Sequence, residues 1–318
     1  MKIVVLDAYC LNPGDLSWDA LSQLGDVTLY DRTPPSEAAT RAAGATAVFT
    51  NKTPLPAATL ALLPDLKYIG VLATGYNVVD IAAARTHGIA VTNIPTYGTA
   101  SVAQFVFALL LEMCHHAGLH SDATRAGDWT RNPDWSFWKS PLIELAGKTL
   151  GIVGFGRIGR ATARIGDAFG MKIIANDTLE SNPPAYPDFK FAPFEDLLRE
   201  SDVVSLHSPL FPETQGMINA LTLSLMKPSA FLINTSRGPL VVDQDLADAL
   251  NTHRLAGAAV DVLSAEPPAA DNPLLSARNC LVTPHIAWAT REARARLMDL
   301  AIGNLSGWIS GRPVNVIP

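Results

Sequence analysis

The sequence predicts an α/β protein with two doubly wound parallel sheets. Three observations lead to this prediction: short β-rich runs alternate with helical patterns, a glycine-rich turn follows one strand pattern, and the chain has 318 residues. Because a single hydrophobic core stops growing at about 250–300 residues, a chain of this length indicates two domains.

The first run of alternating patterns extends from the strand pattern IVVLD at 3–7 to IAVTN at 89–93. Helices are expected over 15–24 in DLSWDALSQL and over 35–44 in PSEAATRAAG. Gly44 closes the second helical pattern, where a residue without a side chain commonly ends a helix. Strands that alternate with helices predict βαβ units and a parallel sheet.

A long apolar segment follows at 99–116, TASVAQFVFALLLEMCHH. Its apolar residues lie on nearly every side of a helix, so we expect it to be buried on more than one side and to bridge two domains. Residues 128–141 contain three tryptophans and are expected to form a loop. Trp129 is expected to pack locally, whereas Trp135 and Trp138 could belong to an interface or to a site.

The second run of alternating patterns begins with TLGIV at 149–153 and ends with CLVTP at 280–284, before a last helical pattern over 290–311. It is similar to the first run in type and not in sequence. These patterns predict a second parallel sheet.

The composition argues against several classes of protein. The formal net charge is −6 with no dense Lys/Arg run, which argues against a nucleic-acid or membrane-surface partner. The longest apolar stretch, 105–114, is shorter than the roughly 20 residues that span a bilayer. The three cysteines have no paired spacing, so we expect neither disulfides nor a metal site, and a cytoplasmic location.

Three glycines form a dinucleotide-binding fingerprint, because Gly154, Gly156 and Gly159 have the G-x-G-x-x-G spacing between a strand and a helix pattern. Gly154 would permit the tight turn, Gly156 the approach of a pyrophosphate, and Gly159 close packing of helix on sheet. The pyrophosphate would lie at the helix N-terminus. The alternative is a glycine-rich turn without a ligand.

An acidic residue ends the next strand pattern, since Asp177 closes KIIAND 18 residues after Gly159. A carboxylate there can accept hydrogen bonds from the ribose hydroxyls of NAD and would repel the 2′-phosphate of NADP. The sequence therefore predicts NAD(H) in preference to NADP(H).

Three polar residues follow later strand patterns: Arg237 in NTSRG, Glu266 in LSAEPP and His285 in LVTPH. Ligands of open parallel sheets bind at the carboxyl ends of the strands. Arg237 suits the carboxylate of a 2-keto acid, and His285 could exchange a proton with the carbonyl oxygen. Glu266, if it lies beside His285, would orient the ring and favour imidazolium. Taken alone, a single histidine such as His285 is more often a buried histidine without a catalytic role than a catalytic one.

Several stretches together resemble the D-isomer-specific 2-hydroxyacid dehydrogenase family, and the likeness covers essentially the whole chain. Within the family, the chain is most similar to the glycerate dehydrogenase and hydroxypyruvate reductase branch. The matching stretches are VLATGYNVVD (71–80), YGTASVAQ (97–104), LAGKTLGIVGFGRIG (145–159), NTSRGPLVV (234–242), AAVDVLSAEPP (258–268) and TPHIAWAT (283–290).

The resemblance implies a role for each matching residue. It makes Arg237 the substrate-binding arginine, His285 the general acid/base and Glu266 its partner. Thr74, Gly75 and Asn77 match the residues that bind the substrate carboxylate. Asp177 matches the residue that binds the adenosine ribose, and Arg157 and Ile158 match those under the pyrophosphate. Thr235 and Asp261 match positions close to the nicotinamide and its ribose. Trp288 could line the substrate pocket or mark the return of the chain to the first domain.

The resemblance also implies the architecture and the assembly. A flavodoxin-like substrate domain comprises residues 1–98 plus 288–318, and a Rossmann nucleotide-binding domain comprises residues 99–287. Family members usually form homodimers through the nucleotide domain. In this branch a tryptophan of the neighbouring subunit can approach the active site, and Trp138 is the candidate. Hinge closure over cofactor and substrate is a further expectation.

The expected function is NAD(H)-dependent interconversion of a small 2-keto acid and its D-2-hydroxy acid, with hydroxypyruvate and glyoxylate favoured. One alternative is the same chemistry on another 2-keto acid, such as phenylpyruvate or a branched-chain acid. Another is a dinucleotide-sensing protein without catalysis, similar to the family-like corepressors.

Overall fold

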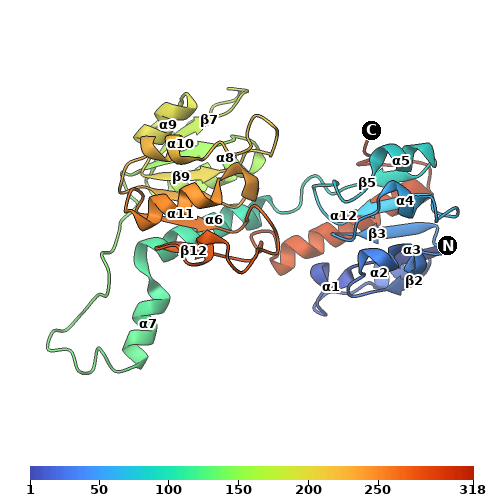
Figure 1. The fold of residues 1–318 in the computed structure, drawn as a ribbon, viewed down its shortest axis with the longest axis horizontal. Coiled ribbons are helices and arrows are strands. Elements are labelled where there is room, and N and C mark those ends of the chain that lie inside the picture. The colour runs from blue at the N-terminus through green and yellow to red at the C-terminus, as the bar shows by residue number, and fades with distance from the viewer. The chain divides into compact units, whose positions relative to one another are not determined.

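The structure is a computed structural model that describes residues 1–318, and the chain divides into two compact units (Figure 1). Unit 1 contains Met1–Gly98 and Trp288–Pro318, and unit 2 contains Thr99–Ala287. Each unit has one sheet, and all neighbouring strands in both sheets are parallel. The predicted fold class is confirmed.

The sheet of unit 1 has five strands in the order β2-β1-β3-β4-β5, which is the flavodoxin-like order. Apart from its first residue, β1 is buried along its length, and β3 and β4 are buried throughout, as expected for strands covered on both faces. The strands are β1 (Lys2–Val5), β2 (Asp26–Leu29), β3 (Ala47–Thr50), β4 (Tyr68–Val71) and β5 (Ala90–Thr92).

Most helices of unit 1 are single turns, and the long C-terminal helix α12 adds its apolar face to the core on one side of the sheet. The helices are α1 (Ala8–Leu11), α2 (Asp19–Ser22), η1 (Pro35–Glu37), α3 (Ala38–Arg41), α4 (Ala57–Leu60), α5 (Ile81–Thr86) and α12 (Arg291–Ile309). The helix expected over 15–24 is only α2. Its first part is instead a turn, because the Asn12 side chain accepts the amides of Gly14 and Leu16.

The sheet of unit 2 has seven strands in the order β12-β11-β10-β9-β6-β7-β8, which extends the Rossmann order by one strand. The strands are β6 (Thr149–Val153), β7 (Lys172–Asn176), β8 (Phe189–Phe191), β9 (Val203–Leu206), β10 (Phe231–Asn234), β11 (Gly257–Val260) and β12 (Cys280–Val282). The order reverses beside β6, so the carboxyl ends of β6 and β9 form the switch point where ligands of such sheets bind.

Helices cover both faces of this sheet, and a separate hydrophobic cluster lies on each face. The helices are α6 (Thr99–His115), α7 (Ala117–Arg125), α8 (Arg157–Ala168), α9 (Phe194–Glu200), α10 (Ala220–Leu225), η2 (Gly238–Leu240), α11 (Asp243–Asn251) and η3 (Pro273–Leu275). As expected, α6 is largely buried, and it ends before His116, whose backbone is left-handed at φ 46°.

After α6 the chain bends by 53° into α7, and α7 with the following residues to about 145 projects from the rest of unit 2 (Figure 1). We call α7 and residues 126–145 the arm. No single helix is long and apolar enough to cross a bilayer, although α6 and α7 together reach that length and composition.

The expected loop over 128–141 is part of the arm and contains neither helix nor strand. Trp129 is 52% exposed, so its expected local packing is limited to a hydrogen bond from its Nε1 to the carbonyl oxygen of Trp135. Trp135 and Trp138 are 88% and 67% exposed.

Candidate active site

The sequence-predicted residues of unit 2 follow the carboxyl ends of its strands. Because all the strands are parallel, these ends meet at one edge of the sheet. Gly154 follows β6, Asp177 follows β7, Arg237 follows β10, Asp261 follows β11 and His285 follows β12.

His285 and Glu266 are in direct contact. The Nδ1 atom of His285 lies 2.6 Å from Oε2 of Glu266, and both side chains are about one-third exposed. The other carboxylate oxygen of Glu266 accepts the amide of Leu263 at 3.2 Å. With Nδ1 held by the carboxylate, Nε2 is the ring nitrogen that can exchange a proton with a substrate.

Arg237 lies in a turn that is fixed by its neighbours. The buried Asn234 donates through Nδ2 to the Arg237 carbonyl and accepts the Ser236 amide, so the turn after β10 is closed on itself. The guanidinium of Arg237 is exposed and donates to the Ser236 carbonyl at 2.7 Å. A planar double donor in this position can bind a carboxylate and an adjacent carbonyl together.

Gly238 brings the Arg237 turn against the loop that carries Glu266. A side chain at Gly238 would overlap the carbonyl group of Leu263 and lie 2.6 Å from the Ser264 nitrogen. Only glycine permits this approach, so the adjacency of the two loops depends on it. Gly238 was not among the predicted site residues, and its place directly after Arg237 is the signal in the sequence that points to it.

The glycine fingerprint has the geometry that a dinucleotide requires. Gly154 has φ 93°, and a Cβ there would lie 2.6 Å from the Ser208 nitrogen and 2.7 Å from the His207 carbonyl carbon. A Cβ at Gly159 would overlap the carbonyl oxygen of Gly154, so helix and turn are in close contact. A Cβ at Gly156 would meet no atom within 4 Å, and Gly156, which has no side chain, is the N-cap of α8. The α8 N-terminus is therefore open to an anion.

Asp177 is half-buried, and both of its carboxylate oxygens already accept hydrogen bonds. Oδ2 accepts the Phe155 amide at 2.6 Å, and Oδ1 accepts the Leu179 amide at 3.0 Å and the Thr178 hydroxyl at 3.4 Å. Asp177 therefore connects the end of β7 to the fingerprint turn. This connection was not part of the sequence prediction.

The hydroxyl of Thr235 fits the predicted cofactor. Its Oγ1 is buried and has no hydrogen-bond partner in the chain, which normally costs free energy unless a ligand or water supplies the partner. Thr235 directly follows β10, at the same strand edge as the fingerprint. An unsatisfied hydroxyl, an open helix N-terminus and a strand-end carboxylate together fit a dinucleotide.

Two more cofactor candidates lie within the fingerprint, between Gly156 and Gly159: Arg157 is exposed and Ile158 is half-buried at the start of α8. Sequence reasoning missed His207, which follows β9 at the switch point. Its Nε2 lies 2.9 Å from the Ser205 hydroxyl, and burial lowers the pKa of His207 to about 4. His207 is therefore a neutral hydrogen-bonding group near neutral pH, where it adds no charge to the site.

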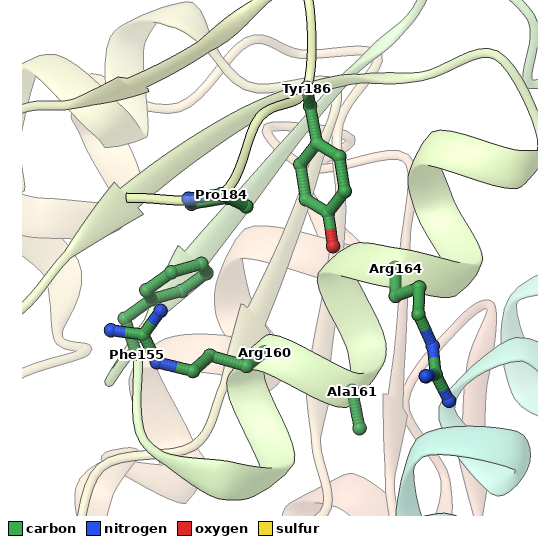
Figure 2. Close-up of a pocket in the computed structure, with 6 residues that line it drawn as sticks. All are labelled: Phe155, Arg160, Ala161, Arg164, Pro184 and Tyr186. Carbon is green, nitrogen blue, oxygen red and sulfur yellow. The ribbon is translucent and has the colours of Figure 1, made fainter. Parts of the chain in front are cut away.

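A pocket of about 380 Å³ lies between α8 and the loop after β7 (Figure 2). The guanidinium of Arg160 lies 4.5 Å from the centre of the Phe155 ring and donates to the carbonyl oxygens of Ser181 and Asn182. The Tyr186 hydroxyl points toward α8 in Figure 2. Arg160 therefore holds the loop that follows Asp177 against the helix of the fingerprint.

The predicted carboxylate-binding residues lie in unit 1, after β4. Thr74 is held in place because its hydroxyl donates to the Ile94 carbonyl and its own carbonyl accepts the Asn93 amide group. Asn77 is exposed and Gly75 is half-buried. Exposed backbone at a strand end of this kind can bind a carboxylate.

The two predicted tryptophans belong to different units. Trp138 lies on the arm of unit 2, whereas Trp288 is the first residue of the second segment of unit 1. Trp288 packs edge-to-face on Tyr97, with ring centres 6.2 Å apart, and so links the two segments of unit 1 where the chain leaves and re-enters it.

Comparison with known proteins identifies the family. The model of the D-isomer specific 2-hydroxyacid dehydrogenase NAD-binding domain matches residues 107–287. A hydroxypyruvate reductase of Blautia hydrogenotrophica is 52% identical over 320 aligned positions, covering 100% of this chain and 99% of that protein. A glycerate dehydrogenase of Methylorubrum extorquens is 40% identical and covers 89% and 88% of the two chains.

Among solved structures, this chain is similar to an acyclic imino acid reductase in complex with NADPH and D-Arg. The TM-score is 0.84, the sequences are 31% identical, and the alignment covers 100% of each chain. The predicted family resemblance is confirmed, and the match to an NAD-binding domain assigns a nicotinamide dinucleotide as cofactor. The chain belongs to the D-isomer specific 2-hydroxyacid dehydrogenases, a family of nicotinamide-dependent oxidoreductases.

Proposed function

We propose that this enzyme uses NAD(H) to interconvert hydroxypyruvate or glyoxylate with D-glycerate or glycolate. The observation that carries the proposal is the 2.6 Å contact between His285 and Glu266 at the strand edge that also holds the fingerprint. The names of the similar proteins, a hydroxypyruvate reductase and a glycerate dehydrogenase, support this choice of substrate.

The protein residues bind the substrate and move one proton. Arg237 binds the carboxylate and carbonyl of the 2-keto acid through its planar guanidinium. His285, as imidazolium, donates a proton from Nε2 to the keto oxygen, and Glu266 stabilises the charge and orientation of the ring through Nδ1. The bound nicotinamide supplies the hydride, and the reverse reaction returns the proton to His285.

The remaining site residues bind rather than react. In unit 1 the backbone around Thr74 and Gly75, with Asn77, binds the substrate carboxylate, so unit 1 is the substrate domain. In unit 2 the turn from Gly154 to Gly159 with Arg157 and Ile158 binds the pyrophosphate, and Thr235 and Asp261 lie by the nicotinamide and its ribose. Trp288 borders the substrate, and Trp138 of a neighbouring subunit approaches it in the dimer.

NAD(H) is preferred over NADP(H) because the strand end after β7 offers a carboxylate and no arginine directly follows it in the sequence. Asp177 suits the ribose hydroxyls and repels a phosphate. Arg160, which packs against the following loop, is engaged by the carbonyl oxygens of Ser181 and Asn182 and lies on Phe155. A 2′-phosphate would therefore meet a negative charge without a free guanidinium from Arg160.

The function is tested by NADH consumption with a panel of 2-keto acids: hydroxypyruvate, glyoxylate, phenylpyruvate and 2-ketoisocaproate. We expect the two smallest acids to give the highest kcat/KM. Higher kcat/KM for phenylpyruvate or the branched acid would replace the proposed substrate. Tight NADH binding without turnover of any keto acid would favour a dinucleotide sensor.

We further propose that two copies associate through unit 2. A groove between α6 and α8 is lined mostly by apolar side chains, including Phe107, Leu111 and the exposed Phe169, and the arm carries the exposed Trp135 and Trp138. Unit 2 thus carries an apolar groove and, on the projecting arm, exposed tryptophans, and a second copy of the chain could cover both. Light scattering tests this: a dimer is expected, and a monomer at micromolar concentration contradicts it.

A further inference from the structure

Asp261 is one of the most deeply buried carboxylates of the protein, with 1% of its surface exposed. It follows β11, and its own amide donates to the Asn234 carbonyl, so its backbone is fixed to the neighbouring strand end. Its side chain points to the loop after β12, which carries His285. The family resemblance implies for Asp261 only a position near the nicotinamide and its ribose.

The two carboxylate oxygens of Asp261 accept three hydrogen bonds from this loop. Oδ1 accepts the Thr283 hydroxyl at 2.6 Å and the Ile286 amide at 2.9 Å, and Oδ2 accepts the Ala287 amide at 2.8 Å. Thr283 precedes His285 by two residues, whereas Ile286 and Ala287 follow it directly. The bonds therefore hold the chain on both sides of His285.

The backbone of His285 needs such support. Its φ is 55°, in the left-handed region that residues with a side chain rarely adopt, and its amide donates to the Thr283 carbonyl in a tight turn. A second contact holds the far end of the loop, since the Ser101 hydroxyl donates to the Ala287 carbonyl at 2.6 Å. Without the carboxylate the loop would relax toward an extended backbone, and the ring would turn away from Glu266.

We propose that Asp261 is a positioning residue for proton transfer: it holds residues 283–287 so that His285 keeps its left-handed backbone and its contact with Glu266. The three groups that face the Asp261 side chain, one hydroxyl and two backbone amides, all donate hydrogen bonds. The side chain must therefore present two acceptor oxygens. The substitution Asp261→Asn would replace one oxygen by an NH₂ group that faces a donor. This inference rests on the proton-transfer role proposed for His285.

The first test is amide hydrogen exchange in the protein without cofactor, resolved to single residues. In Asp261→Asn we expect at least one of the Ile286 and Ala287 amides to exchange at least about 10-fold faster, because each uses a different carboxylate oxygen and one of the two oxygens is lost, whereas the amides of β6 keep their rates. Thr283→Val removes one bond only and should accelerate Ile286 less. It also provides the test if Asp261→Asn does not fold.

The second test is a double-mutant cycle. Asp261→Asn should lower kcat by about 10- to 100-fold and change the pH dependence of kcat, because a catalytic group is displaced. In a His285→Ala background the same change should lower the residual turnover by less than about 2-fold, since Asp261 acts through His285. Because Asp261 also lies by the nicotinamide, the Kd of NADH should rise, but by a smaller factor than kcat falls if the main role is positioning.

Asp202→Asn is the matched control. This carboxylate accepts the Thr149 amide and the Lys227 ammonium, both at 2.8 Å, but it lies before β9 at the opposite edge of the same sheet. Its loss should lower stability and leave the exchange of Ile286 and the pH dependence of kcat unchanged.

Three results would overturn the inference. The first is an unchanged hydrogen-exchange rate of the Ile286 and Ala287 amides in Asp261→Asn. The second is an equal loss of turnover from Asp261→Asn in the presence and in the absence of His285. The third is a raised Kd of NADH in Asp261→Asn together with the wild-type pH dependence of kcat. Wild-type turnover in His285→Ala would instead remove the proposed role of His285, and this inference with it.

Discussion

Replacing Gly238 by alanine tests whether the contact between two loops sets the active-site geometry. Gly238 follows Arg237, and its missing side chain lets this turn lie against Leu263 and Ser264. The Leu263 amide in turn donates to Glu266, the partner of His285. A methyl group at Gly238 therefore pushes on the loop that holds the catalytic carboxylate.

The size of the effect follows from the geometry. The new Cβ would overlap the Leu263 carbonyl and lie 2.6 Å from the Ser264 nitrogen. Non-bonded heavy atoms pack at about 3.5–4.0 Å, so the loops must separate by roughly 2 Å at the overlapped Leu263 carbonyl. Overpacking of this kind costs about 1–3 kcal/mol. For a domain of this size that lowers Tm by about 2–12 °C. A displacement of about 1 Å at a catalytic group can lower kcat by about 10²-fold.

The assay combines a thermal melt with steady-state NADH consumption, and Gly303→Ala is the control. Gly303 is exposed in the middle of α12 with no atom within 4 Å of a new Cβ. Alanine there should stabilise the helix by about 0.5–1 kcal/mol and leave kcat unchanged. If Gly238→Ala kept the wild-type Tm and kcat, the loops would be free to adapt and the reasoning would be refuted.

Three further changes have expected outcomes. His285→Ala should lower kcat by about 10²–10⁴-fold while NADH still binds, and wild-type turnover would remove its role as general acid. Asp177→Ala should raise the affinity for NADPH relative to NADH; an unchanged ratio would separate Asp177 from cofactor choice. Burial lowers the pKa of His207 to about 4, from 6.5 in the unfolded chain. Between these pH values the unfolded chain binds the extra proton, so the free energy of unfolding should fall as pH falls, by at most about 3 kcal/mol because His207 keeps some solvent exposure. Urea titrations from pH 7 to 5 of the wild type and His207→Gln measure this; equal pH dependence would contradict it.

The architecture could be predicted because local patterns determine it. Alternating strand and helix patterns are read within about ten residues, and parallel sheets bury strands on both faces, which gives the apolar runs of β3, β6 and β9. Short helices were less predictable. α2 is one turn long because the Asn12 side chain accepts the amides of Gly14 and Leu16, which precede the helix. These hydrogen bonds depend on the rotamer of one side chain, which the sequence pattern does not reveal.

The candidate site was predicted in part. Residue types and strand ends pointed to Arg237, Glu266 and His285, since a parallel sheet places all strand ends at one edge. The contact between Glu266 and His285, 19 residues apart, needed the structure, because loop conformation and not spacing decides it. The close approach at Gly238 and the three hydrogen bonds of Asp261 could not be predicted from the sequence either, because each joins loops that are far apart in the sequence.

The two strand-end carboxylates, Asp177 and Asp261, show why residue type alone cannot separate binding from positioning. Each accepts hydrogen bonds from a neighbouring loop: Asp177 from Phe155 of the fingerprint turn, and Asp261 from the loop around His285. Removing Asp177 therefore loosens the turn that binds the pyrophosphate, which should weaken NADH and NADPH to a similar degree, because both share that group. Only the ribose differs between them. The ratio of the two affinities consequently reports the ribose contact of Asp177, whereas the loss common to both reports its support of the turn.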